Sequence, residues 1–141
     1  MLRKLLDWLG IGRVPAKERV ILESENIKVV YEGIRGAIVY KNFRAPGKIF
    51  IGRRREFIGS LVVTEKRFVA CGFSQRIISL PLSDPRLAKC RISAENEQLC
   101  LACDASDFGP NQSGEMEFRF FIPDAEKVAA MLIKSIRVYP R

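Results

Sequence analysis

The sequence contains no histidine among its 141 residues. Histidine is the side chain that most often acts as a general base near neutral pH, and it is the commonest metal ligand. Its absence excludes Ser/His and Cys/His nucleophilic catalysis, so a lysine or a carboxylate would have to act in any enzyme. The sequence therefore favours a protein that is not an enzyme, and we expect no metal or other cofactor.

A membrane-spanning run and a secretory signal are also missing. No apolar stretch approaches the ~20 residues that cross a bilayer as a helix. The opening segment has Asp7 within its short apolar run and lacks a small-residue cleavage site. The four cysteines, Cys71, Cys90, Cys100 and Cys103, lie within or beside apolar runs. We therefore expect free, mostly buried thiols in a reducing cytoplasm.

Acidic residues are few relative to basic ones, 16 against 24, and the formal net charge is +8. Three kinds of acidic partner suit this charge: nucleic acid, an anionic membrane face or an acidic protein surface. No recognition-helix motif, zinc finger or aromatic RNA-binding signature accompanies the basic residues, so no specific nucleic acid partner is expected. Apolar residues make up 48% of the chain, enough for one domain with a substantial core.

The centre of the chain, from Gly59 to Asp84, has the clearest strand signals. Three apolar runs rich in β-branched and aromatic residues, at Leu61–Val63, Phe68–Ala70 and Ile77–Leu82, are separated by two polar turns. This pattern predicts a three-stranded antiparallel meander.

Shorter strand signals flank the meander. Ala45-Pro46-Gly47-Lys48 has proline and glycine placed as in a type II turn, so a hairpin is expected to return through residues 49–51, where residues 52–55 interrupt it. Residues 56–64 resume the strand into the meander. Further strands are predicted at Val20–Leu22, Ile27–Tyr31, Ala37–Phe43, Lys89–Ala94 and Leu99–Asp104.

The last strand has a strict period of two. Met116, Phe118, Phe120 and Ile122 alternate with Glu115, Glu117, Arg119 and Phe121. A helix with a broad apolar stripe follows, predicted over Asp124–Ile136, and it is expected to plug one end of the core. The predicted fold class is mostly β with α: a partly open barrel or sandwich of about seven antiparallel strands, capped by this C-terminal helix.

A short amphipathic helix is predicted at the start of the chain. Leu2, Leu5, Leu6 and Leu9 recur at helical spacing, and Trp8 lies beside them. The predicted boundary separates this helix and its linker, residues 1–15, from a domain over residues 16–141. Its apolar side suits packing on the domain, docking on a partner or a second copy, or a weak anchor in an anionic membrane.

The centre of the chain resembles the GRAM branch of the pleckstrin-homology-like domains. Three segments carry the resemblance: Gly59–Thr64, Lys66–Ala70 and Ile78–Asp84, the last reading ISLPLSD. The closing strand and helix suit it too, so the resemblance spans residues 37–136. It implies a partly open barrel whose members are binding modules for lipids, peptides or proteins.

A basic cluster at Lys48, Arg53, Arg54 and Arg55 is the candidate ligand site. Pleckstrin-homology domains that bind phosphoinositides carry lysine and arginine around their first hairpin, and the resemblance implies the same role here. Arginine suits phosphate because its guanidinium offers two parallel donors. The alternative is a solvated basic loop without a ligand.

Two other constellations have the residue types of a reactive site. Cys100 and Cys103 form a C-x-x-C, but in a strand this spacing puts the thiols on opposite faces, which disfavours a shared metal or a disulfide. Asp104, Asp107, Glu115 and Glu117 form an acidic set that could supply an acid–base pair. Glu115 and Glu117, however, alternate with core residues and are predicted to face outward with Arg119.

The sequence thus leaves two functions open. The first is a non-enzymatic binding or scaffold module, cytoplasmic or peripheral at the inner face of the membrane, with an anionic phospholipid as its ligand. The alternative is a protein–protein interaction or homo-oligomer assembly domain without a lipid ligand.

Overall fold

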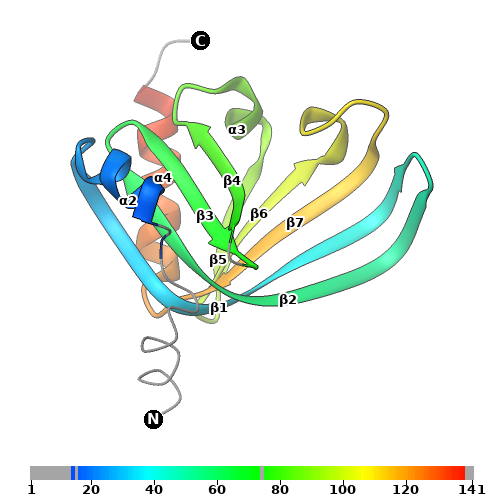
Figure 1. Ribbon diagram of the computed structural model, residues 1–141, viewed down its shortest axis with the longest axis horizontal. Helices are drawn as coiled ribbons and strands as arrows, with labels where there is room; N and C mark the ends of the chain where they lie inside the picture. The colour runs from blue at the N-terminus through cyan, green and yellow to red at the C-terminus, as the bar shows by residue number, and fades with distance from the viewer. Residues whose placement is uncertain (1–13, 15, 74, 139–141) are drawn as a thin grey trace.

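The computed structural model describes residue 14, residues 16–73 and residues 75–138. In chain order the elements are α2 (Ala16–Glu23), β1 (Ile27–Ala45), β2 (Lys48–Thr64), β3 (Arg67–Gly72), β4 (Gln75–Pro81), α3 (Pro85–Lys89), β5 (Arg91–Glu95), β6 (Gln98–Asp104), the short 3₁₀ helix η1 (Ala105–Asp107), β7 (Ser113–Phe121) and α4 (Ala125–Val138). The seven strands form one antiparallel sheet in the order β4-β3-β2-β1-β7-β6-β5 (Figure 1). Within the described chain β4 and β5 do not pair with each other, so the barrel is partly open and the predicted fold class is confirmed.

The long β1–β2 hairpin gives the sheet its curl. These two strands pair with each other along almost their whole length, and each has a different second partner. Residues 36–44 of β1 pair with β7, whereas residues 59–63 of β2 pair with β3. Near its turn the hairpin therefore pairs with β7, and at the end away from the turn it pairs with β3. Its turn end extends away from α4, beside the loop between β6 and β7 (Figure 1).

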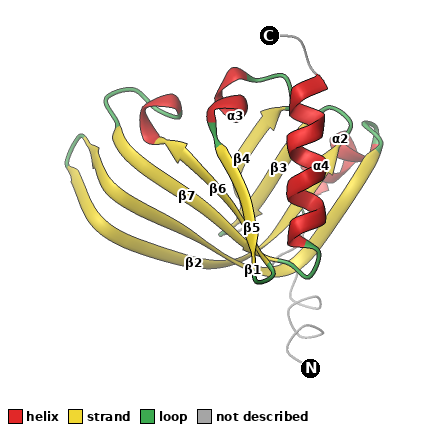
Figure 2. Cartoon of the chain, turned by 180° about the vertical axis from the view of Figure 1, so that it is seen from behind, coloured by secondary structure: helices red, strands yellow, loops and turns green. Residues whose placement is uncertain are grey.

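The core lies between the inner face of this sheet and α4. Inward side chains of the strands, among them Leu61, Phe68, Leu101 and Phe120, are fully buried. The predicted stripe of α4 is confirmed, since Ala125, Val128, Ala129, Leu132 and Ile136 are buried while Ile133 is partly so. Figure 2 shows α4 standing across one end of the sheet near β5. No helix in the described part of the chain has the length and apolar character needed to cross a membrane.

The expected strand at Val20–Leu22 is wrong, because these residues lie in helix α2. A second, smaller apolar cluster explains the helix: Leu22 and Val14 pack with Val62, Val69 and Cys71 on the outer face of β2 and β3. Of the three residues Val20–Leu22, Leu22 packs in this cluster, whereas Val20 and Ile21 remain exposed. An ion pair between Arg19 and Glu32, with an N–O distance of 2.7 Å, ties α2 to β1.

The expected break at residues 52–55 is also wrong, because β2 is continuous from Lys48 to Thr64. The three arginines of this run lie opposite Tyr40, Val39 and Ile38 of β1. Arginine is tolerated here because this part of β2 is an edge without a further strand partner in the described chain, and charged side chains are common on such edges. The turn itself is as predicted, with Gly47 at a φ of 74°.

Two of the four cysteines are not free, contrary to expectation. Cys90 and Cys103 form a disulfide with a Cα–Cα distance of 4.6 Å, and Cys71 and Cys100 remain free thiols. The strand register explains the pair: Arg91 lies opposite Ala102, so the next residues outward in the β5–β6 ladder face each other. The inference of a reducing compartment loses its premise, since disulfides persist mainly in oxidising environments.

Counting thiols checks the disulfide. In the air-oxidised protein, unfolded without reductant, we expect maleimide to modify two thiols per chain and to modify all four after reduction. Cys90→Ser frees Cys103, so three thiols should react in that variant without reductant. Mass spectrometry gives these counts directly. Four modified thiols before reduction would contradict the bond.

Candidate functional site

The turn end of the β1–β2 hairpin lines an open cavity of about 430 Å³. Aromatic side chains of both strands line it and are called its aromatic floor here, and the loop before β7 contributes Pro110 and Gln112. Lys48, Arg53 and Arg55 line the same cavity. Three of the four candidate ligand residues thus line one concave site.

Alternation within the arginine run, residues 53–55 of β2, decides which arginines reach the cavity. Arg53 lies opposite Tyr40 and Arg55 opposite Ile38, and both partners face the core side. Arg54 points to the other face, where its Nε lies 3.2 Å from Glu56 Oε1. Arg54 is therefore a predicted site residue that the structure leaves outside the site.

Aromatic rings hold the two inward arginines in place. The rings of Tyr40, Phe43 and Phe50 pack together with centroid distances of 5.1 to 5.8 Å. The Arg53 guanidinium lies 4.7 Å above the Phe50 ring, and the Arg55 guanidinium lies 4.5 Å above Phe73. Such cation–π contacts orient a guanidinium while leaving its N–H donors available.

Sequence reasoning missed these rings as part of the site. The available signal was that Phe50 lies between Lys48 and the arginine run, two residues after the lysine and three before Arg53. Its counterparts on the facing strand, Tyr40 and Phe43, could only be assigned once the hairpin register was known.

The hairpin also carries a long stretch of positive charge without an acidic residue. Seven basic residues and no acidic residue lie between Glu32 and Glu56. Two of the seven are neutralised, Lys41 by Glu117 at an N–O distance of 2.8 Å and Arg54 by Glu56. In the part of the chain that the structure describes, Lys48, Arg53 and Arg55 form no ion pair with a carboxylate. The cavity therefore carries positive charge that nothing in its walls compensates.

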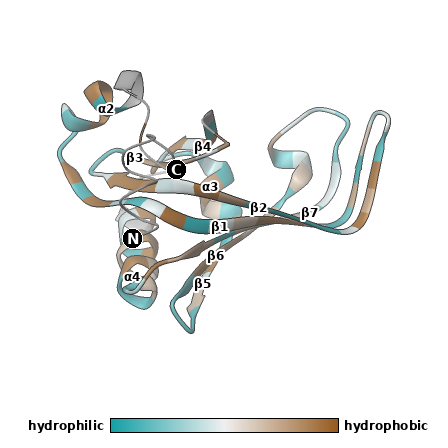
Figure 3. Cartoon of the chain, turned by 60° about the horizontal axis from the view of Figure 1, so that its bottom comes forward, coloured by the Kyte–Doolittle hydropathy of each residue, from teal (hydrophilic) through white to brown (hydrophobic). Residues whose placement is uncertain are grey.

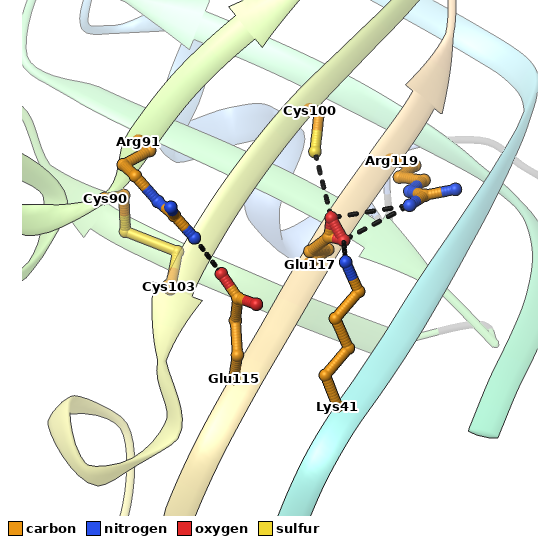
Figure 4. A network of polar contacts seen from close by, with 8 residues as sticks. All are labelled: Lys41, Cys90, Arg91, Cys100, Cys103, Glu115, Glu117 and Arg119. Carbon is orange, nitrogen blue, oxygen red and sulfur yellow. Dashed lines mark hydrogen bonds and ion pairs between the residues drawn. A yellow bond between two sulfur atoms is a disulfide. The ribbon is translucent and has the colours of Figure 1, made fainter. Parts of the chain in front are cut away.

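Glu117 shows why Lys41 is not available to the cavity. The strand pattern predicted Glu117 on the outer face, and it lies there in contact with Lys41 and Arg119 (Figure 4). Its exposed fraction is nevertheless only 7%. Burial opposes its ionisation, yet hydrogen bonds from Lys41 and Arg119 outweigh this effect and hold the pKa of the carboxyl below its ordinary value. Glu117 therefore stays charged at neutral pH and binds both cations.

The other acidic residues do not form a reactive pair. Glu115 contacts Arg91, Asp107 lies 3.7 Å from Lys89, and Asp104 accepts hydrogen bonds from Ser106 at the start of η1. Cys100 lies beside Glu117 on the outer face, and burial raises the pKa of its thiol. Each of these groups has a local partner, and none of them lines the cavity.

The loop before β7 is held against the hairpin by a close backbone contact. β1 has an irregularity between Lys41 and Arg44, where Asn42 takes a φ of 50°. Gly114 faces this irregularity with a φ of 99°. Gln112 and Pro110 lie two and four residues before Gly114, so this contact lies close to the part of the loop that lines the cavity.

No protein-family model matches this chain, and no curated protein matches it. The likeness to pleckstrin-homology-like domains stays a prediction. The other candidate contact residues, Leu2, Leu5, Leu6, Trp8 and Leu9, lie outside the described residues.

Proposed function

We propose that this chain is a non-enzymatic binding module that takes a phosphate-bearing anion into the cavity at the end of the β1–β2 hairpin. The observation that carries the proposal is the convergence of Lys48, Arg53 and Arg55, without carboxylate partners in the described chain, over an aromatic floor. A phosphorylated lipid headgroup and a free phosphorylated compound share this chemistry.

The nature of the cations supports phosphate as the ligand group. A guanidinium presents parallel N–H donors that match two phosphate oxygens, and charge-assisted bonds of this kind are stronger than neutral ones. The rings of Phe50 and Phe73 fix the two guanidinium planes, so less freedom is lost when the ligand binds. The aromatic floor suits the less polar part of a phosphorylated compound.

The composition of the cavity supports binding rather than catalysis. None of the described residues that line it is a carboxylate, a thiol or a serine. The partly open antiparallel sheet and the capping helix α4 also fit what the likeness to pleckstrin-homology-like binding modules implies. That likeness adds weight to the proposal, although fold alone is a weak guide to function.

The arginine run offers a matched test. We expect Arg53→Ala and Arg55→Ala each to weaken binding of inositol hexakisphosphate by about tenfold or more, because a hydrogen bond to a charged group contributes about 1.5–3 kcal/mol. Arg54→Ala removes the same charge from the opposite face and should change the affinity by no more than about twofold. Isothermal titration calorimetry at physiological salt gives these affinities.

Two results would overturn the proposal. Equal losses in all three variants would mean that diffuse positive charge, and not the cavity, attracts the anion. The absence of binding by the wild type would remove the ligand class itself. Circular dichroism of each variant shows whether its fold is intact.

A protein partner is the second candidate. Exposed Val20 and Ile21 on α2, and Val30 on the nearby half of β1, supply apolar surface for such a contact. A contact there makes no demand on Arg53 or Arg55, so the arginine series separates the two functions.

A further inference from the structure

A disulfide joins the start of β5 to the end of β6. Cys90 is the residue between α3 and β5, and Cys103 is the next-to-last residue of β6. Figure 4 shows the bond crossing from one strand to the other. Cys90 is partly exposed, whereas Cys103 is 3% exposed and packs in the core. A thiol from solvent therefore reaches this bond at the sulfur of Cys90.

Both redox states of this cysteine pair suit the fold. In the reduced state the Cys90 thiol has an acceptor, because its Sγ lies 3.3 Å from the carbonyl oxygen of Arg86 in α3. Reduced Cys103 is a small apolar side chain among core residues, as free cysteines commonly are. The five residue pairs of the β5–β6 ladder do not depend on the bond. Reduction therefore loosens this region without separating the two strands.

The bond acts together with two weaker contacts between α3 and the segment that follows β6. Lys89 Nζ lies 3.7 Å from Asp107 Oδ1, and the Arg86 guanidinium lies 5.8 Å from the centroid of the Phe108 ring. The lysine is largely exposed and the arginine is near the outer limit of a cation–π contact, so each interaction contributes little. The disulfide is thus the strongest of these three attachments.

The segment that follows β6 leads to the cavity. Pro110 and Gln112 line the cavity, and they lie seven and nine residues after Cys103. This stretch stands beside the end of the β1–β2 hairpin (Figure 3). Its far end is held by the close approach of Gly114 to the backbone of Asn42, and its near end is held by the disulfide. Freedom gained at Cys103 therefore reaches the cavity-lining residues along one short piece of chain.

We propose that Cys90 and Cys103 form a redox switch: reduction of their bond by a small thiol weakens ligand binding in the cavity. In the oxidised state the bond holds residues 104–112 against α3, and in the reduced state this segment moves more freely. The fraction of molecules with a formed cavity then falls, and the apparent affinity falls with it. The statement on the ligand rests on the proposed function, whereas the statement on the segment does not.

The reaction is a thiol–disulfide exchange. A small thiolate attacks Cys90 Sγ, so the bond to Cys103 breaks, a mixed disulfide forms on Cys90, and Cys103 leaves as a thiolate that takes up a proton. A second small thiol attacks the external sulfur of the mixed disulfide and releases the Cys90 thiol. The two small thiols leave as one disulfide, and the protein has gained two electrons and two protons. The reverse reaction, with a small disulfide as oxidant, restores the bond.

Hydrogen exchange tests the switch without a ligand. The wild type is compared before and after reduction with dithiothreitol, under conditions in which circular dichroism shows both forms folded. We expect backbone amides within residues 104–112 to exchange about tenfold faster after reduction, because local opening becomes easier. Residues 59–63, in the ladder between β2 and β3, should exchange at the same rate in both forms.

Two single substitutions make the comparison specific. Cys90→Ser cannot form the bond, so its segment should exchange at the fast rate with and without dithiothreitol. Cys100→Ser is the matched control, because Cys100 is a free thiol on the same strand as Cys103. It should show the same change on reduction as the wild type. An effect of dithiothreitol that persists in Cys90→Ser would mean that another site responds, and the inference would be wrong.

Titration with inositol hexakisphosphate then tests the link to the cavity. We expect reduction to weaken binding by about fivefold or more in the wild type and in Cys100→Ser. Cys90→Ser should bind at the weaker value with and without dithiothreitol.

The outcomes separate this inference from the proposed function. Equal exchange of residues 104–112 in both forms would refute the switch itself. Equal affinity of the oxidised and reduced wild type, with the ligand bound by both, would refute control of the cavity. If neither form bound the ligand, the proposed function would fail together with the statement on the ligand, and the exchange rates would still decide the statement on the segment.

Discussion

Phe120→Ala is expected to lower the free energy of unfolding by about 3–5 kcal/mol. Phe120 has no exposed surface, and its ring packs edge-on against Phe57 and Phe68 at centroid distances of 6.3 and 6.2 Å. It therefore joins side chains from β2, β3 and β7 at the centre of the barrel. Removing the ring leaves a cavity that these strands cannot close, because each is fixed by its ladder. Urea unfolding followed by circular dichroism gives the free energy.

Phe121→Ala is the matched control from the next position in β7. Phe121 faces outward, is only partly buried, and lies beneath the Arg35 guanidinium at 5.4 Å. We expect its loss to cost less than about 1.5 kcal/mol, from the lost surface contact and cation–π interaction. If the two variants lost equal stability, the two faces of β7 would be assigned incorrectly.

These two neighbours also show what the sequence could predict. Alternation in residues 115–122 placed Phe120 inward and Phe121 outward without any structure, because one face of the strand is buried. The meander, the Pro46-Gly47 turn and helix α4 were predictable for the same reason: each signal is local and agrees with the burial that tertiary packing imposes.

The errors arose where a distant partner decided the outcome. Val20, Ile21 and Leu22 have high strand propensity, yet a helix forms because the outer face of β2 and β3 requires only Leu22. The arginine run resembles a break in a strand, yet it remains extended because Tyr40, Val39 and Ile38 pair with it. The Cys90–Cys103 bond depends on the β5–β6 register, which no local pattern specifies.

The candidate site was predictable only as a set of residue types. The basic run indicated phosphate chemistry, but it could not distinguish Arg54 from its neighbours. To make that distinction, one must know which face of β2 each arginine occupies and which residue of β1 lies opposite it. The cavity also needs Gln112, which lies more than fifty residues away and reaches the hairpin through the β1–β7 ladder.

Gly114 of β7 lies against the backbone of Asn42 and Phe43 in β1, so a side chain at this position should destabilise the fold near the site. Its φ of 99° is strained for any residue with a side chain, and a Cβ there would lie 2.3 Å from the carbonyl oxygen of Asn42 and 2.8 Å from the Cα of Phe43. Both atoms belong to backbone, so neither can rotate away. We expect Gly114→Ala to lower the free energy of unfolding by about 2–4 kcal/mol.

The same substitution should also change the affinity for the ligand. Relief of the clash requires β7 to move from β1 at the irregularity, which carries Gln112 and Pro110 away from Phe43 and widens the cavity. Gly52→Ala is the matched control on the same hairpin, because a Cβ there meets no atom within 4 Å and its φ is not positive. We expect Gly52→Ala to leave the free energy of unfolding unchanged or to raise it by up to about 1 kcal/mol, since alanine restricts the unfolded chain.

Urea unfolding of both variants tests stability, and titration with inositol hexakisphosphate well below the unfolding midpoint tests the cavity. Wild-type affinity in folded Gly114→Ala would show that the wall formed by the β6–β7 loop takes no part in binding, and the ligand would then be held by the hairpin arginines alone.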